Sequence, residues 1–322
     1  MIKVGVVGSA GYTGGELLRI LVTHPEVEIV FVHSNSNAGN KIYQVHQDLI
    51  GYTDLSFTKE LAYDKIDALI LCLGHGDARV FLEKNPTPAS VKVVDLSTDF
   101  RHKEKADGFV YGLPELNKAD ILKANKIANP GCFATSIQLG LLPIANAGKI
   151  EDEIHISAIT GSTGAGVKHG ATTHFSWRNN NVSVYKAFEH QHLKEIGESL
   201  AQLQPGFDHE INFVPFRGDF TRGIYASIYV SSDLTEEEAV KLYKDYYKNH
   251  PFTHVVDFNP NLKQIVNTNN CLVHVKKHGN KLHIISMIDN LAKGASSQAV
   301  QNLNLLFGLE ESTGIKFKPS GF

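Results

Sequence analysis

Short apolar runs alternate with helical patterns through the first third of the chain. Runs rich in β-branched residues occupy 4–7, 27–32, 68–73 and 91–96, and an amphipathic pattern at 16–23 separates the first two. Neighbouring parallel strands need crossover segments of this kind. The alternation therefore predicts βαβ units that build a doubly wound parallel sheet.

The pattern changes after about residue 150 to longer runs in which apolar and polar residues alternate, such as 154–159, 223–230 and 281–288. A period of two marks strands with one buried and one solvated face, which is typical of antiparallel sheets covered by helices on one side. The sequence therefore predicts an α/β fold in which a Rossmann-like domain is joined to an α+β domain with a mostly antiparallel sheet.

A last helical pattern, 296–306, has apolar residues near one face, which suits packing on a sheet. Periodicity alone does not assign this helix to either domain. We expect residues 1–131 with 294–322 to form the dinucleotide-binding domain, and residues 132–293 to form a catalytic and oligomerisation domain.

A glycine-rich turn, Gly8-Ser9-Ala10-Gly11-Tyr12-Thr13-Gly14, stands between the first strand and the first helix. Glycines permit a tight turn and close backbone approach, while the N–H groups and the dipole at a helix N-terminus attract a pyrophosphate. The spacing differs from the common G-x-G-x-x-G fingerprint, so a plain glycine turn is the alternative. The order of strand, turn and helix favours a dinucleotide site.

The end of the second strand indicates NADP rather than NAD. NAD enzymes usually place an acidic residue there to hold the ribose 2'-hydroxyl. This chain has Ser34, Asn35 and Ser36 instead, with Lys41 nearby. Because a carboxylate would repel a 2'-phosphate, we predict NADP as the cofactor, bound in part through Ser34 and Ser36.

The three cysteines, Cys72, Cys132 and Cys271, form no C-x-x-C pair, and their odd number predicts reduced thiols. Cys72 and Cys271 lie in apolar, strand-like runs and are expected to be small buried residues. Cys132 follows Asn129-Pro130-Gly131 and opens a plausible helix. A helix N-terminus stabilises a thiolate, and its unpaired N–H groups can receive an oxyanion. We predict that Cys132 is a covalent nucleophile rather than a buried structural thiol.

Two histidines, His190 and His192, lie on either side of Gln191, just before a helical segment at 193–200. In an extended segment their side chains would share one face, whereas in a helix they would diverge by about 200°. A thiol nucleophile needs a proton acceptor, and one of these histidines could serve. A metal site is the competing interpretation of a His-x-His pair, but no convincing set of further ligands accompanies it, so we predict none.

The overall charge excludes several partners. Lys and Arg total 31 against 34 for Asp and Glu, and the net charge of -3 provides no general attraction to nucleic acid or to an anionic membrane. No stretch approaches the roughly 18 apolar residues of a membrane span. We expect a cytoplasmic protein that acts on a small molecule.

The motifs together resemble the N-acetyl-gamma-glutamyl-phosphate reductases of arginine biosynthesis, a family akin to the aspartate-semialdehyde dehydrogenases. The resemblance runs along essentially the whole chain. Besides the glycine turn and Asn129-Pro130-Gly131-Cys132, it includes the segments 74–76, 94–101, 111–116, 161–166, 185–186, 190–192, 222–224 and 289–299.

This resemblance implies that NADPH reduces N-acetyl-γ-glutamyl phosphate to N-acetyl-glutamate 5-semialdehyde with release of phosphate. Cys132 would attack the acyl phosphate to give a thioester, with His192 as the acid/base and His190 as second choice. The resemblance also implies a homo-oligomer, a dimer or a tetramer. The remaining residues that it assigns are Arg101 and Asn129 at the substrate phosphate, Lys186 and Arg222 as weaker substrate contacts, Gly164 near the nicotinamide, and Asn290 on its carboxamide.

The chain departs from the family pattern at two positions. Gln191 and Asn35 stand where the family commonly has arginine, so a positive charge is lost near the substrate's acyl or carboxylate contacts and near the 2'-phosphate. Three alternatives stay open: the same reaction on another N-acyl group, an aspartate-semialdehyde dehydrogenase, and a nucleotide-sensing protein without catalysis. The intact Cys132 and its two candidate histidines argue against the last.

Overall fold

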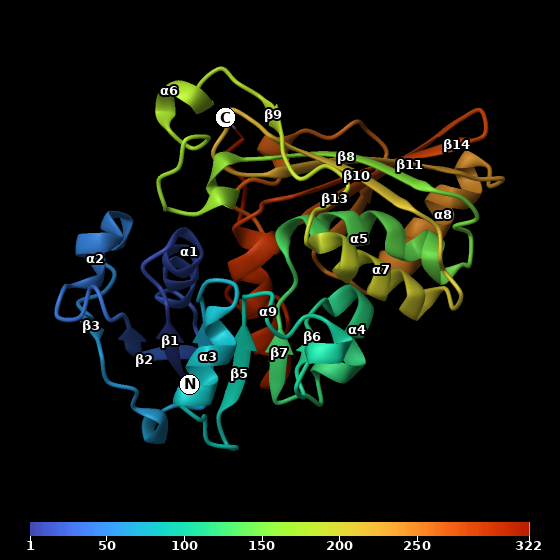
Figure 1. Ribbon diagram of the computed structural model, residues 1–322. Coiled ribbons are helices and arrows are strands. Elements are labelled where there is room, and N and C mark those ends of the chain that lie inside the picture. The colour runs from blue at the N-terminus through green and yellow to red at the C-terminus, as the bar shows by residue number, and fades with distance from the viewer. Residues whose placement is uncertain (322) are drawn as a thin grey trace. The chain divides into compact units, whose positions relative to one another are not determined.

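The computed structural model describes residues 1–321, and the chain divides into two compact units (Figure 1). The first unit comprises Met1–Gly131 with Ala295–Lys316, and the second comprises Cys132–Gly294 with the end of the chain from Phe317. We expected all of 294–322 to belong to the first unit. The structure instead groups Gly294 and residues 317–321 with the second unit. Residues 317–321 form no helix or strand, and no periodicity therefore marked where they belong.

A seven-stranded sheet in which all paired strands are parallel forms the centre of the first unit, as far as residues 1–321 describe it. The strand order is β3-β2-β1-β4-β5-β7-β6. From β1 the chain adds β2 and β3 on one side and then crosses back to add β4 on the other side of β1, so the switch point lies between β1 and β4. Ligands of open α/β sheets bind at such a switch point, outside the carboxyl ends of the strands. The predicted doubly wound sheet is confirmed, with strands β1 Ile2–Val7, β2 Val27–His33, β3 Phe57–Thr58, β4 Ala68–Leu71, β5 Lys92–Asp95, β6 Val110–Tyr111 and β7 Lys126–Ala128.

The helices of this unit bury apolar faces against the sheet. In the first helix Leu17, Leu18, Ile20 and Leu21 are all almost fully buried. That helix begins before the predicted apolar pattern because its first turn is made by the glycine-rich segment. The helices are α1 Tyr12–Leu21, α2 Ile42–Val45, α3 Asp77–Lys84, α4 Pro114–Ile121 and α9 Ser297–Leu306.

The second unit contains a mixed sheet in the order β12-β13-β14-β11-β8-β10-β9. Among the described residues, four of its six strand pairs are antiparallel, which confirms the predicted mostly antiparallel sheet. Helices α5, α7 and α8 cover one face of it (Figure 1). The bounds are β8 Ile154–Thr160, β9 Ser183–Val184, β10 Ile211–Arg217, β11 Ile224–Ser231, β12 Thr253–Val256, β13 Cys271–His278 and β14 Lys281–Ile288, with helices α5 Cys132–Asn146, α6 Phe175–Arg178, α7 His192–Leu203 and α8 Glu236–Tyr247.

Helix α5 is held in place by an internal proline. Pro143 has no N–H to donate, so the carbonyl of Leu139, four residues earlier, lacks its normal helical partner. The hydroxyl of Tyr247, on α8, donates to that carbonyl at 2.6 Å, and Tyr243 donates to the carbonyl of Gly140 at the same distance. A buried carbonyl without a partner would be costly, and the two tyrosines therefore tie α5 to α8.

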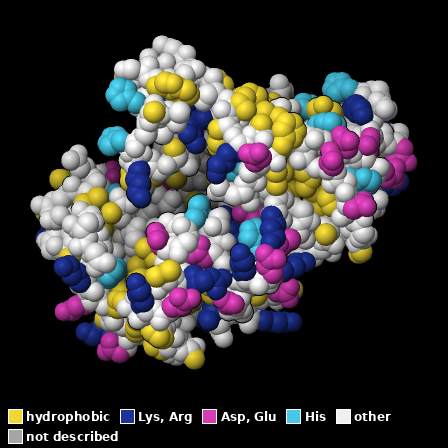
Figure 2. Space-filling model, in the orientation of Figure 1, with side chains coloured by type: hydrophobic (Ala, Val, Ile, Leu, Met, Phe, Trp, Pro, Cys, Tyr) yellow, Lys and Arg dark blue, Asp and Glu magenta, His cyan; other side chains and the backbone are white. Residues whose placement is uncertain are grey.

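Basic and acidic side chains are interspersed over the face of the molecule drawn in Figure 2. This distribution agrees with the small net charge of -3. None of the helices in residues 1–321 combines the length and the apolar character that a membrane crossing requires.

Candidate active site

Cys132 is the first residue of α5. It is partly exposed, whereas the rest of the helix through Ala145 is buried. The N–H groups of the first turn and the positive end of the helix dipole therefore lie at the thiol, which favours its ionised form. The structure thus gives Cys132 the surroundings expected of a nucleophile.

Gly294 packs directly against Cys132. A Cβ atom added at Gly294 would lie 2.8 Å from the Cβ of Cys132, closer than real Cβ contacts allow. Gly294 belongs to a π-helical turn, Ala292–Ser296, which precedes α9. Only glycine fits beside the nucleophile at this position.

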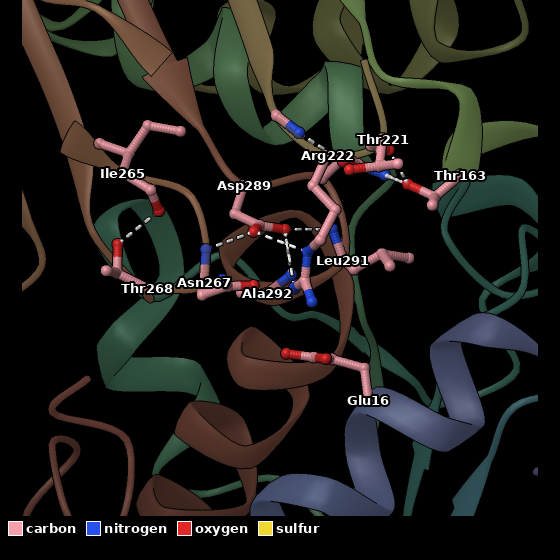
Figure 3. A network of polar contacts seen from close by, with 12 residues as sticks. Glu16, Thr163, Thr221, Arg222, Ile265, Asn267, Thr268, Asp289, Leu291 and Ala292 are labelled. Atoms are coloured by element: carbon pink, nitrogen blue, oxygen red, sulfur yellow. Dashed lines mark hydrogen bonds and ion pairs between the residues drawn. The ribbon is translucent and has the colours of Figure 1, made fainter. Parts of the chain in front are cut away.

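The carboxylate of Asp289 orders the segment that leads to this turn. It is fully buried and accepts two hydrogen bonds from the guanidinium of Arg222 and three from backbone N–H groups. Figure 3 shows these donors converging on the carboxylate from Arg222, Asn267, Leu291 and Ala292. The backbone N–H of Gly294 donates to the carbonyl of Asp289 at 2.9 Å, so the same residue positions the glycine.

The two histidines lie side by side in the second unit. His190 and His192 are only 6% and 5% exposed, and their ring centroids are 4.6 Å apart. Gln191 between them has helical backbone angles, so the segment is not the extended one that would have placed the two rings on one face. They stay together because the backbone N–H of His192 donates to Nδ1 of His190 at 3.2 Å. The ring of Phe133, the second residue of α5, contacts both.

That hydrogen bond distinguishes the roles open to the two histidines. Nδ1 of His190 is an acceptor, so its proton sits on Nε2 and its lone pair is engaged. Burial, and then the charge of Lys186, lower the pKa of His190 to about 4, against a smaller opposing effect of Glu195. His190 is therefore a neutral N–H donor near pH 7, and the role of His192 as the proton acceptor for the thiol stays a prediction.

Glu195 is a buried residue of the site that the sequence did not single out. It lies three residues after His192 on α7, and its Oε1 is 3.9 Å from Nε2 of His192. Residues three apart on a helix share a face, so the spacing of Glu195 from His192 could have predicted their proximity from the sequence alone. A buried carboxylate here can stabilise the imidazolium that forms when His192 takes a proton.

Tyr185 is a second missed residue, and its ring contacts His190 at a centroid distance of 5.9 Å. Its pKa is raised to about 12, first by burial and then by the negative charge of Cys132, while Arg217 opposes the shift. The phenol therefore stays protonated and responds to the charge on the nucleophile. The sequence placed Tyr185 inside a matching motif but gave no reason to connect it with Cys132.

The glycine turn of the first unit has the shape of a phosphate-binding loop. Gly8 has φ +78°, and a Cβ at Gly14 would lie 2.2 Å from Cα of Ser9. Within residues 1–321 the buried Oγ of Ser9 has no hydrogen-bond partner, and the first turn of α1 carries neither a capping side chain nor an acidic residue. His46, which the sequence did not single out, fixes the turn because its Nε2 lies 2.7 Å from the carbonyl oxygen of Ser9. These residues fit a bound pyrophosphate.

Hydroxyl and amide groups gather at the end of β2. The Oγ atoms of Ser34 and Ser36 are 3.5 Å apart, and the side-chain amide of Asn37 donates to both. Lys41 does not join them, because its Nζ donates to the carbonyl of Asp54 at 2.5 Å. A contribution of Lys41 to NADP binding stays a prediction.

Two predicted phosphate-binding residues hold the backbone of the first unit. The guanidinium of Arg101 is buried and donates to the carbonyls of Asn129 and Leu96, both at 2.8 Å. The side chain of Asn129 donates to Ala295 and accepts from Asn302. Both residues shape the segment before Cys132, and their contact with the substrate stays a prediction.

The remaining predicted residues of the second unit also make internal contacts. Arg222 pairs with Asp289, and the amide of Asn290 joins the N–H of Gly223 to the hydroxyl of Thr163. Asn290 thereby fixes the short 3-10 turn Ser162–Ala165, which carries Gly164. Lys186 has φ +48° and donates from Nζ to Oε1 of Gln191 at 3.1 Å. No group of three or more potential metal ligands occurs within residues 1–321.

The lowered pKa of His190 predicts a pH effect on stability. Between the ordinary value of 6.5 and about 4, the unfolded histidine binds a proton and the folded one does not, so this residue makes the fold less stable as pH falls. The full effect amounts to about 3 kcal/mol. We expect His190→Asn to lose less stability than the wild type between pH 7 and pH 4.5, measured by urea unfolding. Parallel pH profiles of the two proteins would contradict this expectation.

Comparison with known proteins agrees with this geometry. A family model described as "Semialdehyde dehydrogenase, NAD binding domain" matches residues 3–124, and another described as "Semialdehyde dehydrogenase, dimerisation domain" matches residues 132–290. An N-acetyl-gamma-glutamyl-phosphate reductase of Bacteroides thetaiotaomicron is 58% identical over all of both chains. This chain belongs to the N-acetyl-gamma-glutamyl-phosphate reductase family.

Other members of the reductase family and more distant structures extend the comparison. The N-acetyl-gamma-glutamyl-phosphate reductase of Flavobacterium johnsoniae is 55% identical over all of both chains. Aspartate semialdehyde dehydrogenase II of Vibrio cholerae is 18% identical, with a TM-score of 0.75 over 96% of this chain and 98% of that one. The Candida albicans aspartate semialdehyde dehydrogenase, solved with NADP, is 16% identical, with a TM-score of 0.74 over 95% of this chain and 98% of that one. The two structures share the fold, and this reductase family member is an oxidoreductase with a nicotinamide-cofactor domain.

Proposed function

We propose that this chain reduces N-acetyl-γ-glutamyl phosphate to N-acetyl-glutamate 5-semialdehyde, with NADPH as the reductant and phosphate as the second product. The observation that carries the proposal is the placement of Cys132 at the N-terminus of α5, with a buried histidine pair and Glu195 in the same unit. Full-length relatives at 58% and 55% identity carry the corresponding name.

The residues of the second unit supply the covalent chemistry. His192 accepts the proton of the Cys132 thiol, and Glu195 stabilises the resulting imidazolium. The thiolate attacks the acyl carbon, and the N–H groups at the start of α5 and Nε2–H of His190 can stabilise the oxyanion. Collapse of this adduct expels phosphate and leaves a thioester on Cys132.

The second half of the reaction reverses the roles of these groups. A reduced nicotinamide, when bound, would supply a hydride to the acyl carbon of the thioester, and the N–H groups at the start of α5 could then stabilise the hemithioacetal anion that forms. His192, now protonated, can return its proton to the departing sulfur. The C–S bond breaks as the aldehyde forms, which regenerates Cys132 for the next turnover.

The preference for NADP is part of the proposal. Ser34, Ser36 and Asn37 offer hydroxyl and amide donors at the end of β2, and no carboxylate occurs in residues 34–41. The buried hydroxyl of Ser9, unpaired within residues 1–321, and the open N-terminus of α1 support binding of the pyrophosphate that NADP and NAD share. Discrimination between NADP and NAD therefore depends on the end of β2 alone.

The purified protein is expected to reduce NADP when it is given N-acetyl-glutamate semialdehyde and inorganic phosphate. We expect kcat/KM for NADP to exceed that for NAD by at least about tenfold, equivalent to about 1.4 kcal/mol. Ser34→Asp should reverse the preference because its carboxylate repels a 2'-phosphate, whereas Ser34→Ala serves as the uncharged control. Appearance of NADPH is followed by absorbance. Turnover that does not depend on phosphate would contradict the acyl-phosphate reaction.

A substrate panel distinguishes this function from its alternatives. Aspartate semialdehyde tests the runner-up activity, and semialdehydes with different N-acyl groups test the group on nitrogen. The match to a dimerisation domain supports a homodimer or a tetramer, which light scattering would reveal as a multiple of the chain mass. A cytoplasmic location completes the proposal, supported by cysteines that form no disulfide within the described residues.

A further inference from the structure

We propose that Arg217 binds the α-carboxylate of the substrate and thereby selects N-acyl amino acid derivatives over simple acyl phosphates. This inference rests on the proposed function. Arg217 is the last residue of β10 and was not among the residues that the sequence suggested.

The position of Arg217 is fixed by the strands around it. Its backbone carbonyl accepts a hydrogen bond from Nη1 of Arg178 at 2.5 Å, and the carbonyl of Pro215, two residues earlier, accepts from the N–H of Tyr185 at 3.1 Å. Its guanidinium carbon lies 4.5 Å from the ring centroid of Tyr185. A stacked guanidinium is pre-organised, so less conformational freedom is lost when it binds an anion.

Tyr185 connects Arg217 to the nucleophile. The Tyr185 ring contacts the His190 ring, with their centroids 5.9 Å apart, and it also contacts the guanidinium of Arg217. Burial, and then the charge of Cys132, raise the pKa of the phenol, whereas Arg217 opposes this shift. Arg217 thus contacts a half-buried tyrosine whose ring also contacts His190 and whose pKa responds to the charge on Cys132.

The charge of Arg217 is not neutralised by a carboxylate within residues 1–321. In the same described part of the chain, its Nε is buried and has no hydrogen-bond partner. The other two arginines of this unit are more fully engaged: Arg222 is paired with Asp289, and Arg178 donates from its Nη atoms to two backbone carbonyls and to the hydroxyl of Ser183, although its Nε, like that of Arg217, is buried and unpaired within the described residues. A partly buried guanidinium without a counter-ion is suited to an anionic ligand.

The proposed substrate supplies an anion at the required end. In an N-acyl-glutamyl phosphate, three carbon atoms separate the α-carboxylate from the acyl carbon that Cys132 attacks. A planar guanidinium can hold a carboxylate through two parallel hydrogen bonds, which fixes its orientation as well as its charge. Lys186 is the other cation near His190, but its ammonium is exposed and already donates to Gln191.

The decisive experiment compares two substrates that differ only in the carboxylate. These are N-acetyl-glutamate semialdehyde and 4-acetamidobutanal, each assayed with phosphate and NADP. We expect Arg217→Met to lower kcat/KM for the carboxylated substrate by on the order of 100-fold, mainly through KM, and to change that for 4-acetamidobutanal by less than about twofold. For the carboxylated substrate, kcat/KM of Arg217→Lys should fall between the values of the wild type and Arg217→Met, because lysine retains the charge without the planar fork.

A matched control separates recognition from structure. Lys281→Met removes a cation of the same sheet, whose Nζ donates to Ser231 and makes no contact with Arg217 or Tyr185, so it should change kcat/KM for both substrates by less than about twofold. Inhibition constants provide a second measurement: in Arg217→Met, inhibition by N-acetyl-glutamate should weaken by a similar factor, while that by 4-acetamidobutanoate should not change.

Equal effects of Arg217→Met on both aldehydes and both inhibitors would overturn the assignment, and so would no effect on any of them. Absence of wild-type turnover with N-acetyl-glutamate semialdehyde would instead count against the proposed function. The two failures are therefore distinguishable. If Arg217→Met does not fold, as judged by circular dichroism, Arg217→Lys takes its place in the same inhibition assay, where unchanged inhibition by N-acetyl-glutamate would overturn the assignment.

Discussion

Cys132→Ser is expected to lower kcat by at least about 10⁴-fold, because a serine hydroxyl in this setting is almost entirely un-ionised and cannot form the thioester. The variant should still fold and bind the cofactor, since serine is nearly isosteric and the space beside Gly294 is unchanged. Steady-state kinetics with matched circular dichroism spectra test this expectation.

The other two cysteines provide the controls for this variant. Burial, with a smaller contribution from the charge of Asp95, raises the pKa of the Cys72 thiol, and Cys271 is fully buried with its Sγ 3.5 Å from Oγ of Ser286. Cys72→Ala and Cys271→Ala should therefore keep kcat within about threefold. Covalent catalysis would be excluded if Cys132→Ser retained turnover comparable to theirs.

His192→Asn is expected to lower kcat by about 10³-fold, within the range that general acid–base catalysis contributes. His190→Asn should cost about tenfold, because asparagine can still accept the N–H of residue 192 through its side-chain oxygen while the Nε2–H donor is lost. The smaller effect expected for His190→Asn follows from the hydrogen bond that already engages Nδ1 of His190.

Glu195→Gln tests the same arrangement from the other side. A neutral amide cannot stabilise an imidazolium as a carboxylate does, so this variant should lose activity but less than His192→Asn. Each variant is assayed at saturating substrate with the wild type as reference. If His190→Asn were the more damaging of the two histidine substitutions, the roles would have to be exchanged.

Hydrophobic periodicity was enough to predict both sheets. Runs such as that of β4 are buried on both faces, which is why they are continuously apolar, whereas β8 and β11 alternate because only one face is covered. Cys132 could be recognised for a related reason, since its activation depends on a local feature, the start of a helix.

Side-chain partners were predictable only where they are local. Arg101, Asn129 and Asn290 donate to residues far away in the sequence, so their structural contacts could not be read from motifs. Arg217 and Tyr185 meet because β9 pairs with β10, and that pairing depends on the tertiary fold. Glu195 is the exception, because its spacing from His192 is local.

The π-helical turn at Ala292–Ser296 makes the nucleophile sensitive to a length change in a neighbouring segment. A π turn contains one residue more than an α-helical turn, and each residue of an α-helix advances by about 100°. A one-residue deletion here would be absorbed easily by the backbone, yet it would rotate a residue with a side chain into the place of Gly294. A deletion at this site would thus displace Cys132 while leaving the rest of the fold intact. In alignments of related chains, the length of this turn therefore indicates whether the glycine still lies beside the nucleophile.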